Sequence, residues 1–372
     1  MTKRHRTPLL ERSSRDVLAG ARSWPDVVSG FRDVHLADNE SVHVVALGSL
    51  TPVADVLNEQ APTGLKKIAD HDSLALYGYR RRFGRRHQHE VAGEFLIVKC
   101  DDVPVSLIVY VGRPNFLRFG LDILLDRLYP RVARPFLAQR ELHGLLQSLQ
   151  RYVQPDALRI QEYTAKGRLR MPARRRFESV RDWTDIDPDA AFREAAERNV
   201  WFRSVRFEVV GGEKSGRWAG ACGRLSKYGH VTINATLELV DQAIISGLVR
   251  ITAESLRLFS NRERVGTPAH KPKPLEVVYE APLLRRPEDL KRLRDGLARF
   301  PHGSCTVLHA NPYLHAALVD NRDFSAVDIW VLSESSILIV PQLHASPAAL
   351  KRLVNHIFEN FGEGRIGEPQ EA

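Results

Sequence analysis

Three side chains in the last hundred residues could together support hydrolytic chemistry. His309 ends one expected strand, Asp328 begins another, and Asp320 lies between them. Sites are commonly built at strand ends and on the loops beyond them, so these groups could meet at one edge of a sheet. A histidine with two carboxylates could hold a divalent ion for phosphodiester hydrolysis. The alternative is ordinary loop chemistry, in which the aspartates cap a helix and solvate a connection.

Two basic clusters could instead contact nucleic acid. Residues 80–86 form a basic loop with five arginines and neighbouring tyrosines, and residues 166–181 are rich in arginine and nearly free of apolar residues. Phosphates attract dense cations, and adjacent aromatic rings can stack on bases. The candidate contacts are Arg80, Arg81, Arg82, Arg85, Arg86, Arg174, Arg175 and Arg176. The alternative is a solvated loop and a domain linker whose charge serves solubility.

Signatures of metal and cofactor sites are missing from the sequence. His87 and His89 could share one side of a strand, but neighbouring arginines repel a cation and no further ligands accompany the pair. The motifs GxxxxGK[ST], GxGxxG, HExxH, GxSxG and CxxC are absent. We therefore predict no metal site and no cofactor, except a divalent metal if the His309 cluster is a nuclease site. Whether the protein is an enzyme stays open.

The overall charge is compatible with nucleic-acid binding. The 372 residues include 54 basic and 45 acidic side chains, which gives a net charge of +9. Arginine far outnumbers lysine, and arginine is the better bidentate ligand for phosphate. Codon usage in a GC-rich bacterial genome would produce the same excess.

Cysteine usage and hydropathy favour a cytoplasmic location. Cys100, Cys222 and Cys305 lie far apart in apolar runs, where reduced thiols behave as small buried hydrophobes. No apolar run approaches the roughly 20 residues that a membrane span needs. The basic start of the chain leads into polar residues, so we expect neither a secretory signal nor contact with a membrane.

The elements that must position these residues follow from periodicity and from capping signals. Apolar runs and alternation predict strands, and apolar residues at helical spacing predict helices. The expected strands are residues 42–47, 94–100, 104–110, 158–163, 204–210, 219–225, 230–235, 275–281, 304–308, 327–332 and 337–340. The expected helices include residues 119–128 and 142–153, and others that begin at Asp187, Pro287 and Ser346.

These elements predict an α+β protein with two domains, each a mixed or antiparallel sheet with packed helices. A single hydrophobic core rarely serves more than roughly 250–300 residues, so a chain of 372 residues is expected to form two domains. We predict an N-terminal domain over residues 1–165, a basic linker over 166–181 and a C-terminal domain over 182–372.

Three functions are compatible with these patterns. The first is a non-catalytic nucleic-acid-binding subunit, with a protein partner or self-association through the C-terminal domain. The second is a metal-dependent phosphodiesterase or nuclease built on the His309 cluster. The third is a scaffold subunit that binds only proteins. The composition as a whole suggests a bacterial accessory protein from a multi-gene system such as antiviral defence. No sequence motif supports this hypothesis.

Overall fold

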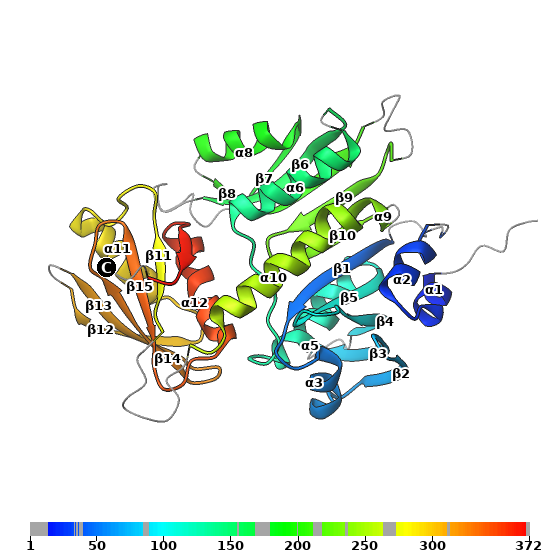
Figure 1. Cartoon of the computed structure of the whole chain (residues 1–372), viewed down its shortest axis with the longest axis horizontal. Helices are drawn as coiled ribbons and strands as arrows, with labels where there is room; N and C mark the ends of the chain where they lie inside the picture. Colours follow the sequence, from blue (N-terminus) through cyan, green and yellow to red (C-terminus); the bar gives the residue numbers. More distant parts are fainter. Residues whose placement is uncertain are drawn as a thin grey trace, which may run out of the picture.

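The protein contains two antiparallel sheets, each packed with helices (Figure 1). The computed structural model describes residues 14–369 apart from 33, 35, 37–39, 85–88, 155, 168–178, 199, 211–217, 235–236, 263–272 and 311–312. The predicted α+β class with two domains is confirmed. Within the described ranges, no helix has both the length and the apolar character needed to cross a membrane.

The larger sheet has ten strands in the order β2-β3-β4-β5-β1-β10-β9-β8-β6-β7. Its strands are β1 (Ser41–Gly48), β2 (Leu65–His71), β3 (Leu74–Phe83), β4 (His89–Lys99), β5 (Val105–Gly112), β6 (Leu158–Gly167), β7 (Ser179–Ile186), β8 (Val200–Val209), β9 (Cys222–Ser226) and β10 (His230–Ile233). Its helices are α1 (Ser14–Gly20), α2 (Trp24–Gly30), α3 (Val53–Gln60), α4 (Pro114–Phe116), η1 (Leu117–Leu121), α5 (Asp122–Arg127), α6 (Gln139–Val153), α8 (Pro188–Glu197), α9 (Glu238–Val240), η2 (Asp241–Ile245) and α10 (Ser246–Phe259).

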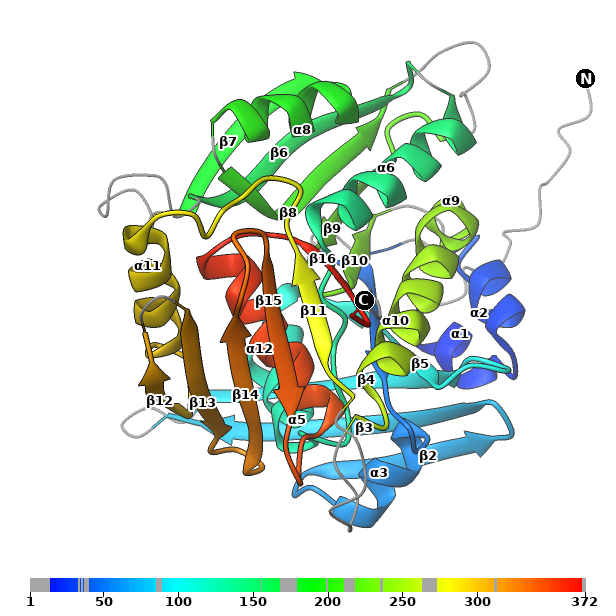
Figure 2. The same ribbon diagram turned by 60° about the vertical axis from the view of Figure 1, so that its left-hand side comes forward.

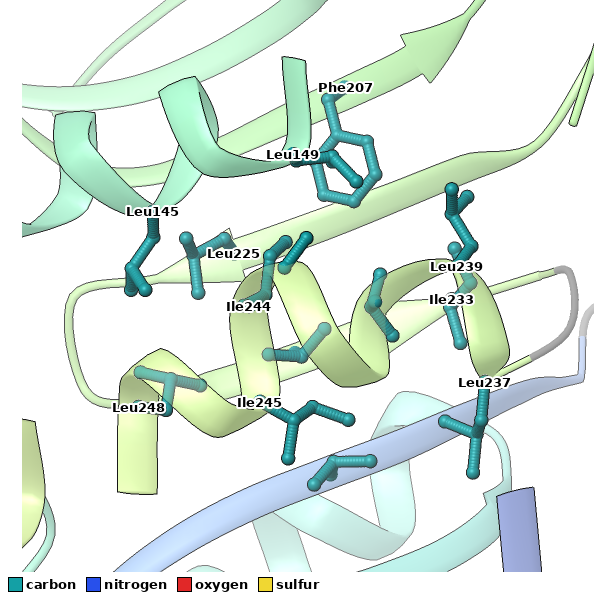
Figure 3. Close-up of a cluster of buried hydrophobic side chains, with 14 of the residues drawn as sticks. Leu145, Leu149, Phe207, Leu225, Ile233, Leu237, Leu239, Ile244, Ile245 and Leu248 are labelled. Atoms are coloured by element: carbon teal, nitrogen blue, oxygen red, sulfur yellow. The ribbon is translucent and has the colours of Figure 1, made fainter. Parts of the chain in front are cut away.

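One face of the ten-stranded sheet is apolar over its central strands, β3 to β5, β1, β10 to β8 and β6. Alternate residues of each strand project to this face and pack against α1, α2, α6, α8 and α10. Figure 3 shows the centre of this core, where Leu145 and Leu149 of α6 and Ile244 of η2 approach Leu225 and Phe207 from the sheet. On the opposite face, α3 and the α4–η1–α5 helix cover a second apolar core over β1, β3, β4 and β5.

The smaller sheet has six strands in the order β12-β13-β14-β15-β11-β16. These are β11 (Leu275–Val278), β12 (Gly303–His309), β13 (Leu314–Asp320), β14 (Ser325–Val331), β15 (Ser336–Pro341) and β16 (Arg365–Gly367), packed with α11 (Pro287–Leu297) and α12 (Pro347–Asn360). The predicted start of α12 is confirmed, since the Ser346 hydroxyl accepts a hydrogen bond from the amide of Ala349. We call residues 273–369 the C-terminal domain and residues 14–262 the N-terminal domain.

The division between the sheets does not coincide with the expected linker at residues 166–181. The strands on either side of that segment, β6 and β7, pair directly with each other, and β8 to β10 continue the same sheet. Residues 182–262 therefore belong with the N-terminal strands, and the sheets divide after α10. A basic connection between paired strands and a linker between domains can have the same composition, so the sequence does not distinguish them.

Two segments expected to be loops are strands. Arg80, Arg81 and Arg82 lie in β3, and residues 314–320, which precede Asp328, form β13. The Arg80 segment is polar, and antiparallel pairing with β4 satisfies its backbone. Residues 314–320 are mainly apolar and pair with β12 and β14.

Candidate nucleic-acid interface

Strands β6, β8, β9 and β10 present a polar surface on the side away from α6 and α8. Alternation directs one set of their side chains into the apolar core and the other set to this surface. We call it the polar sheet face. It consists of Arg159, Gln161, Glu162, Thr164, Ser204, Arg206, Glu208, Cys222, Arg224, Ser226, His230 and Thr232.

The strand register aligns the charged residues of the polar sheet face in one row. Glu162 lies opposite Arg206, Arg206 opposite Arg224, and Arg224 opposite Thr232. The row continues to His43 in β1. With neighbouring strands about 4.8 Å apart, the row crosses roughly 19 Å of the sheet.

A buried carboxylate fixes one arginine of the row. Glu162 is only 1% exposed, and both of its oxygens accept hydrogen bonds of 3.1 Å from Nη2 of Arg224. Nη1 of Arg224 also donates to the hydroxyl of Ser204 at 3.2 Å. Charge-assisted contacts of this kind hold a guanidinium in one orientation. Arg224 is thus a positioned cation on the sheet surface.

Arg159 and Arg206 are the available cations of the polar sheet face. Both are half-buried, and neither has an ion-pair partner among the residues that the structure describes. Half-buried arginines commonly pack their stems on apolar surface and keep the guanidinium group in solvent. An external anion could therefore bind them without breaking an existing salt bridge.

A neutral histidine pair lies where the polar row meets the first half of the sheet. Nε2 of His43 donates to the carbonyl of Gly112 at 3.1 Å, so its Nδ1 accepts the hydrogen bond of 3.0 Å from Nε2 of His230. The His43 ring also stacks on Tyr110, with 4.3 Å between ring centroids. Burial lowers the pKa of His43 to about 4 and that of His230 to about 3. These imidazoles are uncharged near neutral pH and stabilise the centre of the sheet.

The arginines predicted around position 80 are largely occupied by contacts within the protein. Arg80 and Arg82 are exposed, and both pair with Glu90 on the adjacent strand, at 3.4 and 2.9 Å. Arg81 donates to the carbonyl of Phe119 at 2.9 Å. The remaining predicted contacts lie outside the described residues: Arg85, Arg86, Arg174, Arg175 and Arg176.

The strand ends that flank the two basic clusters lie at opposite ends of the large sheet. Phe83 and His89 pair beside one cluster, and Gly167 ends the strand before the other. The register across the intervening strands places these two positions on opposite sides of the row that contains His43. The described strands therefore do not bring the clusters toward one common end.

The predicted His309, Asp320 and Asp328 cluster does not assemble. His309 is exposed at one end of β12, opposite His315, whereas Asp320 is buried at the far end of β13. Asp328 projects to the outer face of the sheet, 3.7 Å from His315, while Asp320 faces the helices. Alternation separates the two carboxylates because Asp320 pairs with Ser325, three residues before Asp328.

Within the part of the chain that the structure describes, no group of three or more His, Cys, Asp or Glu residues is placed to share an ion. His89 is described and packs against Phe83, whereas His87 is not among the described residues.

Sequence reasoning did not single out the polar sheet face. The sequence does contain an indication of this surface. Residues 158–163 and 204–210 alternate between apolar and polar side chains, and the polar positions include Arg159, Glu162 and Arg206. Their alignment with Arg224 depends on pairings between strands distant in the sequence.

Comparisons with known proteins assign this chain to no family. Neither the protein-family models nor the curated proteins gave a match. Among solved structures, one match is the di-domain ARO/CYC StfQ from the steffimycin biosynthetic pathway. The two share 11% identity over 57% of this chain and 97% of that one, with a TM-score of 0.16. This likeness carries no inference about fold or function.

Proposed function

We propose that the protein is a non-catalytic, nucleic-acid-binding subunit that contacts the phosphate backbone through its polar sheet face. The observation that carries this proposal is the pair Arg159 and Arg206, half-buried cations that form no ion pair with the described residues, although Glu208 and Glu162 lie opposite them in the register. Arg206 belongs to the row in which Glu162 orients Arg224, and Arg159 lies on the same face opposite Glu208. The net charge of +9 would assist the approach of a polyanion.

The composition of this face favours binding that does not depend on sequence. The residues that define it include no Phe, Tyr or Trp, so stacking on bases is not expected there. Arginine forks match phosphate oxygens, and such contacts position a nucleic acid without reading its bases. We also propose a cytoplasmic location, which agrees with three free cysteines.

Fluorescence anisotropy with labelled single-stranded DNA, duplex DNA and RNA tests the proposal. The full-length protein is titrated in EDTA over a range of salt concentrations, and so is the variant Arg159→Ala/Arg206→Ala. Each lost phosphate contact should reduce the log–log salt slope by about 0.7–0.9 and affinity near 0.1 M salt by about fivefold or more. The double variant should therefore bind about 30-fold more weakly.

The matched control removes the same charge elsewhere. Arg285 and Arg365 are exposed arginines of the C-terminal domain, with partners at 3.9 and 3.1 Å, respectively. Arg285→Ala/Arg365→Ala should retain nearly all of the affinity. Equal losses in the two double variants, or no binding by wild type at low salt, would overturn the proposal. A loss confined to Arg80→Ala/Arg82→Ala would move the interface to β3.

A protein-binding subunit is the second candidate, favoured by the free edge of the smaller sheet. β12 is the last described strand on its side of that sheet, and its Val307 and Leu308 are exposed. Such an edge can pair with a strand from another chain. We would measure the molar mass of wild type and Leu308→Lys by light scattering. A dimer that the substitution dissociates supports pairing between two copies, and a monomeric wild type argues against it.

A further inference from the structure

A cavity of about 300 Å³ lies between the two domains. One wall comes from β1, α5 and the segment after α5, including Leu47, Leu125 and Pro135, and the other comes from α12 of the C-terminal domain. Figure 2 shows α12 between the strands of the small sheet and the N-terminal domain. Cavities at domain junctions with an apolar wall and a few polar groups are common ligand sites.

Lys351 on α12 is a buried cation that lines this cavity. It is 7% exposed and makes no hydrogen bond or ion pair with any of the described residues. Burial lowers its pKa to about 8, and the nearby carboxylate of Glu141 only partly opposes this shift. A buried ammonium is costly without a counter-charge. An anion that enters the cavity could supply the missing negative charge to the ammonium group of Lys351.

Two further donors of α12 line the same cavity. Nη2 of Arg352 is occupied by Asp320 at 2.8 Å and by the carbonyl of Pro301 at 2.7 Å, but its buried Nε has no hydrogen-bond partner in the described structure. The side chain of Asn355 also lines the cavity and has no partner among the described residues.

The other charged groups at the cavity do not neutralise Lys351. Arg134 pairs with Asp122 at 2.5 Å, and Arg352 already pairs with Asp320. Asp126 is exposed and belongs to the wall opposite α12. The positive charge of Lys351 is thus opposed only in part, by Glu141, and makes no ion pair with the described residues at the buried side of the cavity.

We propose that this cavity binds a small organic anion between the two domains. A carboxylate or phosphate group would accept hydrogen bonds from Lys351 Nζ and Arg352 Nε. The body of the ligand would pack on Leu47, Leu125 and Pro135. The volume is at the lower end of the range for ligand pockets, which favours a small molecule over a nucleotide. Because both domains contribute to the site, the bound anion stabilises their contact.

Calorimetric titration of the full-length protein with benzoate and, separately, inorganic phosphate tests this site. Sodium chloride keeps the ionic strength constant, so that only specific binding gives a saturable signal. We expect saturable binding of at least one probe and a rise in the thermal midpoint at saturating concentration. Benzoate alone would identify a carboxylate on an apolar body as the ligand class, and phosphate alone would identify a phosphate group.

The variant Lys351→Met removes the charge and keeps the length of the side chain. Replacing an unpaired buried charge with an apolar group is not expected to unfold the protein, and circular dichroism verifies this. The variant should bind the probe at least tenfold more weakly, whereas Lys291→Met, on α11 beside a different pocket, should bind as wild type does. Saturable binding of neither probe, or equal binding by Lys351→Met and wild type, overturns the proposal.

Discussion

Replacing Asp320 with alanine should destabilise the junction between the two domains. The side chain is 1% exposed at the end of β13. It accepts hydrogen bonds from the hydroxyl of Tyr129 at 2.8 Å and from the amide of Arg322 at 3.0 Å, and it pairs with Arg352 at 2.8 Å. Tyr129 belongs to the N-terminal domain and Arg352 to the C-terminal domain, so one carboxylate joins both.

The expected cost follows from the partners that the substitution leaves behind. Removing one member of a buried ion pair costs about 3–5 kcal/mol, because the other charge stays buried without compensation. The Tyr129 hydrogen bond to an ionised acceptor contributes about 1.5–3 kcal/mol, which overlaps with the first value. The Arg352 side chain is 21% exposed, so solvent relieves part of the penalty. We expect the free energy of unfolding to fall by about 3 kcal/mol.

Urea unfolding of wild type, Asp320→Ala, Tyr129→Phe and the double variant measures the loss of unfolding free energy and the coupling energy between the two side chains. The double-mutant cycle should give a coupling energy of about 1–2 kcal/mol between the two side chains. Asp295→Ala is the control, since Asp295 pairs with Arg294 at 3.4 Å on the surface and should contribute less than about 1 kcal/mol. A cost below about 1 kcal/mol for Asp320→Ala, or zero coupling, would refute the reasoning.

Two further predictions concern the stability of the large sheet, one on its dependence on pH and one on the substitution of Gly229. Wild-type stability should fall as the pH drops from about 7 to 5, because the unfolded histidines take up protons near pH 6.5 while burial holds the pKa of His43 near 4 and that of His230 near 3. In urea titrations across this range, His43→Asn/His230→Asn should show a shallower decline, and an unchanged slope would contradict the assignment. Gly229→Ala should cost about 2–4 kcal/mol, since φ is +66° and the new Cβ would lie 2.1 Å from Cγ of Pro135. The control Gly296→Ala has open space around a helical residue and should gain up to about 1 kcal/mol; similar losses in both variants would exclude the steric cause.

Local patterns predicted many elements of the fold. The Asp187 cap is confirmed, since its side chain accepts from the amide of Ala190, and the apolar stripe after Ser346 forms α12. The expected strand at residues 42–47 coincides with β1. The Arg80 region of β3 was missed because polar strand residues lack a clear apolar period until a neighbouring strand is known. The strand β13 was missed although Leu314, Ala316 and Leu318 alternate, because the segment around them was interpreted as a loop.

The candidate sites depended much more on contacts between distant segments. The sequence indicated which residues could bind anions. Clustered arginines are conspicuous in a sequence, whereas Arg159 and Arg206 occur singly along strands and were overlooked. Asp320 was predicted as a catalytic group because its type suits catalysis. Its burial against Arg352 and Tyr129 gives it a structural role that no local pattern shows.

The sequence by itself determined the alternation of strands, the helix caps and the excess of positive charge, because each depends on neighbouring residues or on composition. Only the tertiary structure decided that β6 to β10 complete one ten-stranded sheet, that their register aligns Glu162, Arg206 and Arg224, and that Lys351 faces a cavity between the domains. The physical reason is that strand pairing and domain packing are set by contacts between residues far apart in the chain. Their free energy comes from burying whole surfaces together, and no single segment encodes it.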